Sequence, residues 1–299
     1  EWRDKIHSTA KKNIQPYYPT EEAGNEILNS ACTYLIDCDS CGGQIPLVGK
    51  WWINQRSGEG DAVRPIYQDG EVSYEHIKVP EEVPKEEFDP ADGPVKNRDA
   101  KCPHCGVPTQ NEEVKTKLSD GDFEYSVYGV NYKTDEGDWK FRAGSEVDID
   151  GMEKAAERVK SDFELMSFLS EPIDISSRTN DPRAYGMDEW RDIYTPRQLV
   201  VHYEYLQAYE QYKEEIREEY EEQKSNAILT VLALSSSRCV SFNSRLSQWY
   251  DGRGCTQNLF ADNNYALKRM FGDDNLSAER RGYIARSNQI IEAYEELVS

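Results

Sequence analysis

The sequence predicts an α+β protein in which zinc-ribbon β-hairpins, carrying a long loop insertion, precede a mainly helical region. Two cysteine pairs indicate the ribbon: residues 38–43 read CDSCGG and residues 102–106 read CPHCG. Segments rich in β-branched and aromatic residues surround both pairs, as is typical of strands. After Gly151 the apolar residues recur at helical spacing. With 299 residues, the chain is long enough to bury a hydrophobic core without disulfides.

We expect residues 1–31 to form a polar N-terminal helical segment, interrupted at Pro16 and Pro19. A zinc-ribbon β domain is expected over residues 32–145. Its strand-like character begins at Thr33. It continues in three short apolar segments, at residues 34–36, 45–48 and 51–53.

A long loop is expected inside this β domain. Residues 80–97 read PEEVPKEEFDPADGPVKN and have no periodic apolar face. Proline and acidic residues at this density favour an exposed, flexible loop. Beyond the second cysteine pair, two alternating segments at 123–128 and 139–141 flank Asp135-Glu136-Gly137, a pattern typical of a β-hairpin.

A helical domain is expected over residues 146–299. Its first helix is predicted to begin near Asp150. Thr195-Pro196 supplies an N-cap and a first-turn proline for a long helix, and the acidic run at 214–222 is expected to be its solvated face. Two further helices are predicted, at residues 227–240 and 278–297.

The cysteines favour a bound metal. Their number is seven, which is odd, and four of them form two CxxC pairs, a pattern that indicates metal ligands rather than disulfides. A C-x2-C turn holds two sulfurs about 3.5 Å apart, the spacing that two tetrahedral zinc ligands require. Gly42 and Gly106 follow the pairs and allow the positive φ with which a backbone wraps a sulfur. The predicted ligands of one structural zinc ion are Cys38, Cys41, Cys102 and Cys105.

Two alternatives to zinc are a set of unrelated reduced thiols and a thioredoxin-type redox pair. His104 lies inside the second pair and is a substitute ligand, although a histidine in this place usually points away from the metal. A site with four thiolates has no open coordination position, so we assign it no catalysis. The other three cysteines, Cys32, Cys239 and Cys255, are expected to be ordinary small, weakly apolar residues.

The chain is strongly acidic, with a formal net charge of -21. Nonspecific nucleic-acid binding relies on positive charge that displaces counterions, so charge alone argues against a DNA partner. A second interpretation is a high-salt cytoplasm, where an acidic surface keeps a protein hydrated. No apolar run approaches the roughly 18 residues of a bilayer-spanning helix, and the first residues lack the regions of a signal peptide. We therefore expect a cytoplasmic protein with no membrane partner.

Two apparent motifs fail. Gly49-Lys50 lacks the upstream glycine and the following Ser or Thr of a P-loop. Residues 146–157 approach a calcium loop, but they begin with Glu and follow a strand-like segment instead of a helix. No nucleophile motif, Gly-rich cofactor loop or HExxH motif occurs, so the sequence assembles no active site.

Three stretches of the chain together resemble one family. They are the first cysteine pair with the strand after it (38–52), the segment YGMDEWRDIYTPRQL (185–199) and the segment FNSRLSQW (242–249). In this order they resemble the large adenine-specific DNA methyltransferases that contain a zinc ribbon and a DUF1156 region. The resemblance runs from about Ile14 to Trp249 and weakens beyond Phe260, so it implies no role for the last part of the chain.

The resemblance implies methyl transfer from S-adenosylmethionine to adenine N6 in DNA. It also implies a Gly-rich cofactor motif near the start and an Asp-Pro-Pro-Tyr motif near the end. Neither motif is present, and the nearest matches are Asp89-Pro90-Ala91 and Asp181-Pro182-Arg183. The chain therefore resembles the region between the two motifs. S-adenosylmethionine is expected to bind only through the missing catalytic part, in cis or in trans.

Our first hypothesis is a noncatalytic zinc-ribbon and helical region that contributes DNA recognition or scaffolding to such an enzyme. The candidate DNA contacts are Lys50, Trp51, Trp52, Arg56, Arg197, Asn243, Ser244 and Arg245. Each also has an ordinary structural interpretation, as a core, surface or turn residue. The second hypothesis is a non-enzymatic zinc-ribbon adaptor that binds a protein partner through its acidic helices.

Overall fold

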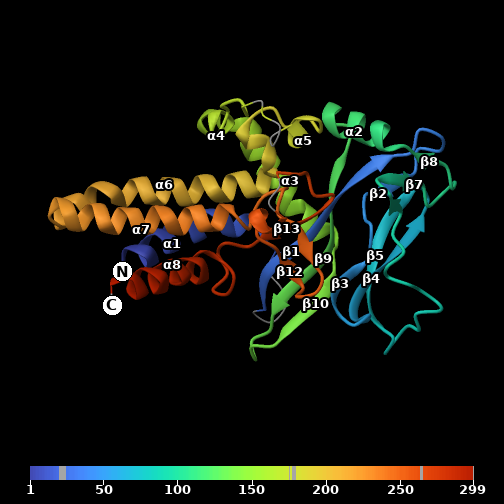
Figure 1. Cartoon of the computed structure of the whole chain (residues 1–299), viewed down its shortest axis with the longest axis horizontal. Coiled ribbons are helices and arrows are strands. Elements are labelled where there is room, and N and C mark those ends of the chain that lie inside the picture. Colours follow the sequence, from blue (N-terminus) through green and yellow to red (C-terminus); the bar gives the residue numbers. More distant parts are fainter. Residues whose placement is uncertain (20–24, 175, 177–179, 263–264, 299) are drawn as a thin grey trace.

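The computed structural model describes residues 1–19, 25–174, 176, 180–262 and 265–298. It combines a bundle of helices with antiparallel sheets, as expected for the predicted α+β class. Figure 1 shows a helical arm on one side of the molecule and the strands on the other. The arm consists of α1 (Trp2–Ile14), α6 (Pro196–Glu219), α7 (Glu222–Val240) and α8 (Tyr283–Val298).

The central sheet is antiparallel, with the strand order β10-β9-β1-β13. Its longest strand is β1 (Glu26–Asp37), of which every residue except the first and last is buried. A short strand, β2 (Gln44–Pro46), pairs with the end of β1. The other members are β9 (Glu124–Lys133), β10 (Trp139–Ala143) and β13 (Met270–Asp274). The predicted hairpin at 123–128 and 139–141 is confirmed, because β9 and β10 pair antiparallel.

Besides a two-stranded β11–β12 sheet, two three-stranded sheets accompany the central one. The first has the order β3-β4-β5, and the second has the order β6-β7-β8. Their bounds are β3 (Trp52–Arg56), β4 (Glu59–Gln68), β5 (Glu71–Val79), β6 (Val95–Lys96), β7 (Asp99–Lys101) and β8 (Pro108–Thr109). The predicted loop at 80–97 ends in β6, and it packs back onto the fold where Trp51 N donates to the Pro90 carbonyl at 2.6 Å.

The N-terminus of α6 forms as predicted. The Thr195 hydroxyl accepts from Gln198 N at 3.2 Å, and the Gln198 side chain accepts from Thr195 N at 3.0 Å. This reciprocal pair is a capping box, which satisfies two backbone donors that a helix start leaves open. The helix then packs between α1 and α7. In the part of the chain that the structure describes, no helix is both long enough and apolar enough to cross a bilayer.

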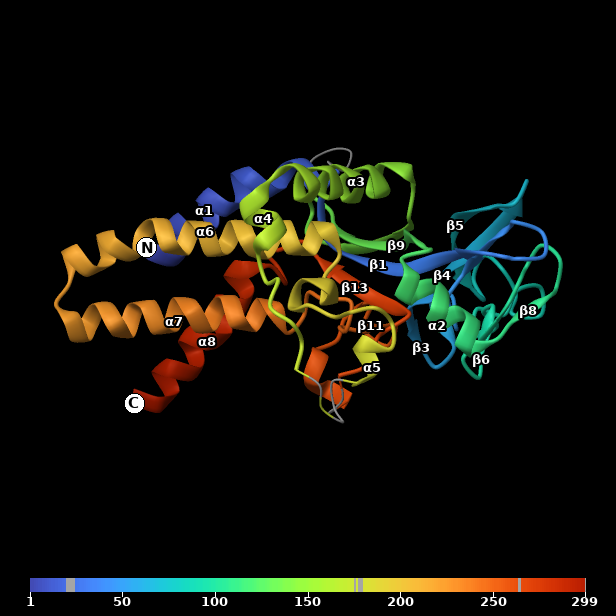
Figure 2. The ribbon, with the colours of Figure 1, turned by 90° about the horizontal axis from the view of Figure 1, so that it is seen from above.

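The helix α3 (Glu146–Ser161) covers the central sheet beside β9, as Figure 2 shows. It begins earlier than the expected start near Asp150, because Ser145 and Asp148 form a capping box at its N-terminus. The remaining elements are short. Among the described residues they are α2 (Asn111–Asp120), α4 (Phe163–Ser167), α5 (Asn180–Arg183), β11 (Trp249–Tyr250), β12 (Cys255–Thr256) and the 3-10 turns at Gln15–Tyr17, Trp190–Ile193 and Leu259–Asp262.

Two sequence-based expectations were wrong at the level of elements. Residues 26–31 belong to β1 and are not helical, because their backbone pairs with β9 and, from Asn29 onward, also with β13. The last predicted helix begins at Tyr283, and the strand β13 precedes it. Since β13 pairs with β1, the structure joins the predicted 32–145 and 146–299 regions in one sheet.

Candidate metal centre

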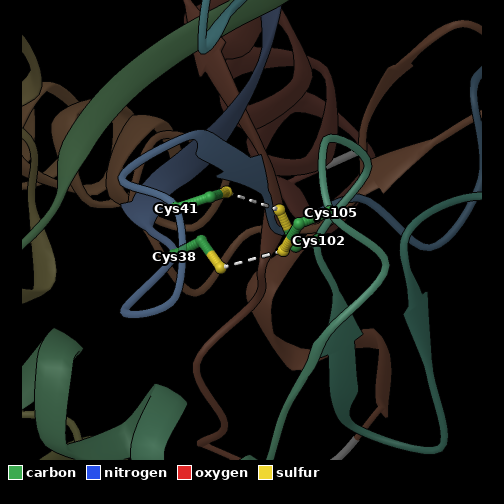
Figure 3. A group of neighbouring side chains, drawn as sticks. All are labelled: Cys38, Cys41, Cys102 and Cys105. Atoms are coloured by element: carbon green, nitrogen blue, oxygen red, sulfur yellow. Dashed lines mark hydrogen bonds between the residues drawn. The ribbon is translucent and has the colours of Figure 1, made fainter.

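The four cysteines of the two CxxC pairs meet at one point, where the loop after β1 faces the loop after β7 (Figure 3). The Cys38 and Cys105 sulfurs are 3.7 Å apart, and so are the Cys41 and Cys102 sulfurs. All four sulfurs lie within 4.8 Å of one another. Four sulfurs that bind one zinc ion at about 2.3 Å in tetrahedral geometry are about 3.8 Å apart. The arrangement therefore fits a single tetrahedral metal ion.

The two loops have matching backbone conformations. Gly42 has φ 72° and donates from its N–H to the Cys38 carbonyl at 2.8 Å, while Gly106 has φ 79° and donates to the Cys102 carbonyl at 2.9 Å. A positive φ is unstrained only for glycine, so each turn depends on its glycine. This confirms the role that the sequence predicts for the two glycines.

Backbone amides face the sulfurs in both loops. At Cys38, burial acts to raise the pKa of the thiol, but the N–H groups of Ser40 and Cys41 and the neighbouring thiols lower that pKa to about 7. Burial raises the pKa of Cys102 to about 12, although two backbone N–H groups of its own loop oppose that shift. Four ionised thiols this close repel one another. A bound divalent cation would offset that repulsion, and the N–H groups would stabilise the thiolates.

The four thiols converge on one point, which argues against two unrelated cysteine pairs. A disulfide has an S–S distance of about 2.05 Å, and all seven cysteines are free. His104 does not belong to the metal-binding group. Its ring forms an edge contact with Tyr67, at 5.5 Å between centroids, and fills the space where a Cβ on Gly43 would lie. His104 is half-buried and packs against Gly43 and Tyr67, as expected for a histidine that is not a ligand.

The helix α2 holds the first loop in place. Lys117 on α2 binds Asp39 of that loop, with 2.6 Å between Nζ and Oδ1. The Lys117 side chain is only 13% exposed, so its charge is held near the cysteine loop. Cys38 and Cys102 are buried, whereas Cys41 and Cys105 are exposed. A metal ion bound here would be partly accessible to chelators but would have four protein ligands, which is typical of a structural site.

Six of the eight candidate DNA contacts lie in the interior. They are Trp51, Trp52, Arg197, Asn243, Ser244 and Arg245. Each has a partner within the chain: the two tryptophans pack in hydrophobic clusters, and the polar side chains form internal hydrogen bonds. These six residues are therefore corrected from surface contacts to interior residues, because burial keeps them from DNA in this structure.

The other two candidates, Lys50 and Arg56, reach the surface. Lys50 is 40% exposed and forms an ion pair with Asp251, at 2.6 Å between Nζ and Oδ1. Arg56 is exposed at the end of β3. The Gln55 side chain also donates to Asp251, at 3.1 Å, so Lys50 lies close to the end of β3. Only these two predicted DNA contacts are placed where a nucleic acid can reach them.

The structure reveals a buried charged network that the sequence analysis missed. Asp273 and Asp274 on β13 are both fully buried. Asp273 binds Arg197 on α6, and Asp274 binds Arg286 on α8, at 3.2 Å between Oδ2 and Nη2. No local pattern predicts these pairs, because the paired residues are 76 and 12 positions apart and lie on different elements. The remaining cysteines, Cys32, Cys239 and Cys255, are buried and lie outside the metal-binding group, as expected.

No family model, curated protein or solved structure matches this chain.

Proposed function

We propose that Cys38, Cys41, Cys102 and Cys105 bind one structural zinc ion and that the two loops form a zinc ribbon. The observation that carries this proposal is the convergence of four thiols, all within 4.8 Å, from two loops with the same glycine-terminated turn. Thiolates in tetrahedral arrangement favour zinc over harder cations such as magnesium or calcium. The ion would fasten the end of β1 to the β6–β8 sheet.

We further propose that the chain is the zinc-ribbon and helical region of an S-adenosylmethionine-dependent DNA adenine-N6 methyltransferase. The resemblance of three stretches motivates this proposal, and their contacts support it. Arg245 of the third stretch donates its N–H to the carbonyl of Ile193 in the second, at 2.8 Å. Tyr34, four residues before the first stretch, accepts from the Arg245 side chain at 3.0 Å. Trp51 of the first stretch and Trp249 of the third pack in one hydrophobic cluster. The stretches thus pack together as parts of one interior, as expected if they characterise one domain.

Scaffolding is the role that we favour for this region within such an enzyme. The formal net charge of -21 opposes phosphate binding, and six of the eight candidate contacts are buried. Lys50 and Arg56 remain as candidate DNA contacts. Methyl transfer itself is assigned to a catalytic part in cis or in trans.

An electrophoretic mobility shift with the purified chain and a labelled duplex, at 20 mM and 200 mM salt, tests the DNA part of the proposal. Binding through surface cations should weaken with salt, since each released counterion contributes to the slope. The double variant Lys50→Gln/Arg56→Gln should abolish any binding, and Lys213→Gln/Arg217→Gln on α6 is its matched control. No shift with the wild-type chain at either salt would leave scaffolding alone.

A non-enzymatic adaptor is the second candidate function. The acidic surface favours it, because a protein partner with basic residues would be attracted where DNA would be repelled. The sequence of the open reading frame on both sides of this segment distinguishes the two functions. An Asp-Pro-Pro-Tyr motif downstream and a Gly-rich loop upstream would establish the methyltransferase, and their absence would favour the adaptor or a catalytic chain encoded separately.

A further inference from the structure

A cleft of about 820 Å³ lies between the β4–β5 hairpin, strand β9 and the start of α3. It is separate from the four cysteines, none of which lines it. Its walls come from residues 66–74, 124–127 and 144–153, together with Leu35 and Gln44. In Figure 1, β5 and β9 belong to different sheets of the molecule.

The cleft borders the edges of two strands. Four consecutive residues of β5 (71–74) and four consecutive residues of β9 (124–127) line it. Successive side chains of a strand point to opposite faces, so a cavity on one face meets only alternate residues. A run of consecutive residues instead indicates that the cavity lies along the backbone edge.

Among the described residues, both edges lack a neighbouring strand at this place. The strand β5 pairs only with β4, and it ends the order β3-β4-β5. The strand β9 pairs with β1 along residues 124–133, whereas β10 covers its other edge only from Gly129 to Lys133. The Gly144 N–H still donates to the Tyr128 carbonyl at 3.1 Å, and the chain then leaves the sheet to enter α3. From Val127 back to Glu124 the second edge of β9 borders the cleft, and Gly144 lies against the Val127 carbonyl.

The two edges are not equally open. The Val72 N–H on β5 is already bonded to the Gln44 side chain, at 3.1 Å. Tyr74 and Ser126 bridge the two strands through their hydroxyl oxygens, at 2.9 Å. These contacts partly close the β5 side, so the β9 edge at 124–127 is the better place for an added strand. Strand edges of this kind are templates for pairing with another chain.

The lining of the cleft is acidic, which favours a positively charged ligand. Its lining contains six carboxylates and no lysine, arginine or histidine. The carboxylates come from all three walls: Asp69, Glu71, Glu124, Glu146, Asp150 and Glu153. Six carboxylates among the nineteen lining residues is a larger share than the 56 acidic residues make up among the 299 of the whole chain. Apolar side chains such as Leu35, Ile66 and Ile149 lie among these acids.

We propose that this cleft binds an extended, lysine- or arginine-rich segment of a partner protein, which adds a strand to the free edge of β9. Main-chain hydrogen bonds to alternate residues of 124–127, those whose backbone groups point away from β1, would supply the pairing. Alternate side chains of the segment would reach the acidic walls. The segment would continue the sheet at the position that β10 occupies further along β9. This proposal does not depend on DNA binding or on methyl transfer.

Fluorescence anisotropy with a labelled decapeptide of alternating lysine and valine tests the proposal on the full chain. The peptide should bind, and Glu124→Gln/Glu153→Gln should weaken its affinity at least tenfold. The matched control is Glu215→Gln/Glu218→Gln on α6, which removes the same charge from an exposed surface away from the cleft and should change the affinity less than twofold. Equal weakening by both variants would mean attraction to the acidic surface in general and would overturn the proposal.

A second peptide separates strand addition from charge alone. The same decapeptide with N-methyl groups on alternate residues keeps its charge, but one of its edges has no backbone N–H groups left to donate hydrogen bonds. It should bind at least tenfold more weakly than the unmodified peptide. Equal binding by the two peptides, or displacement of the peptide by spermine at equal concentration of positive charge, would overturn strand addition. Absence of any binding by the unmodified peptide at low salt would overturn the whole proposal.

Discussion

Arg197 on α6 and Asp273 on β13 form an ion pair in the interior, with 2.9 Å between Nε and Oδ2 and almost no exposure of either side chain. Arg197 also donates to the Asp148 carbonyl at 3.1 Å and lies over the Tyr18 ring, 4.9 Å from its centroid. The pair joins the helical arm to the central sheet. Another helix of the arm, α8, is joined to the same strand by the ion pair between Arg286 and Asp274.

Asp273→Asn should destabilise the protein by about 3 kcal/mol, because it leaves the Arg197 charge buried without a counter-ion. Urea unfolding followed by circular dichroism measures this change. Glu210→Gln is the matched control, since it removes an exposed partner of Lys213 and should cost less than about 0.5 kcal/mol. Similar losses in both variants would contradict the importance of the buried pair.

Acidification from pH 7 to pH 5 should lower the free energy of unfolding through His202. Burial lowers the pKa of His202 to about 4, against the opposing effect of the Asn243 carbonyl that it contacts. In the unfolded chain the pKa of a histidine is about 6.5. Between that pH and about pH 4, His202 is therefore protonated in the unfolded state but neutral in the folded state. Stability is therefore complete above about pH 6.5 and is lost as the pH falls toward 4, by about 2 kcal/mol for this group at pH 5.

The variant His202→Gln should reduce that pH dependence. His7 titrates in the same direction, because burial and then the Lys11 charge lower its pKa to about 4, so part of the dependence should remain. Urea midpoints at pH 7, 6 and 5 are the measurement. An unchanged slope in the His202→Gln variant would show that this side chain does not carry the effect.

Cys41→Ser should reduce bound zinc from about one ion per chain to a small fraction and should weaken the region around β6–β8, since a structural zinc ion contributes to folding. Plasma emission spectrometry of dialysed protein measures the metal. Cys255→Ser is the control, because Cys255 lies outside the metal-binding group and should leave the zinc content unchanged. Full retention of zinc by Cys41→Ser would rule out the four-thiolate site.

Arg245→Lys should destabilise the protein by about 2 kcal/mol while keeping the charge. The Arg245 side chain donates to the Tyr34 hydroxyl at 3.0 Å and to the Asp192 carbonyl at 2.8 Å, and its guanidinium lies 5.2–5.7 Å from the ring centroids of three aromatic residues. A lysine ammonium cannot reproduce this forked donation and stacking. Thermal or urea unfolding measures the loss, with the exposed Arg56→Lys as control. A stability equal to the wild type would contradict the interior role of Arg245.

Local signals were sufficient for several elements. Thr195-Pro196 predicted the start of α6, since a side-chain cap and a first-turn proline act within one turn of the chain. Alternating residues predicted the β9–β10 hairpin for the same reason. The Gly after each CxxC predicted two matching turns, because the positive φ needs no distant partner. Conversely, the helix predicted over residues 26–31 is wrong, because the pairing of this segment with β9 and β13 is not a local property.

The sequence by itself determined the four cysteines, their turns and the α+β class, because each depends on a few neighbouring residues. Only the tertiary structure decided that Arg197 and Arg245 are interior residues, that β13 closes the central sheet, and that β9 keeps an open edge at an acidic cleft. Burial and strand pairing join residues up to hundreds of positions apart. A short stretch of sequence does not show which other segment will cover it. Whether an arginine is buried or exposed is therefore decided only by the folded structure.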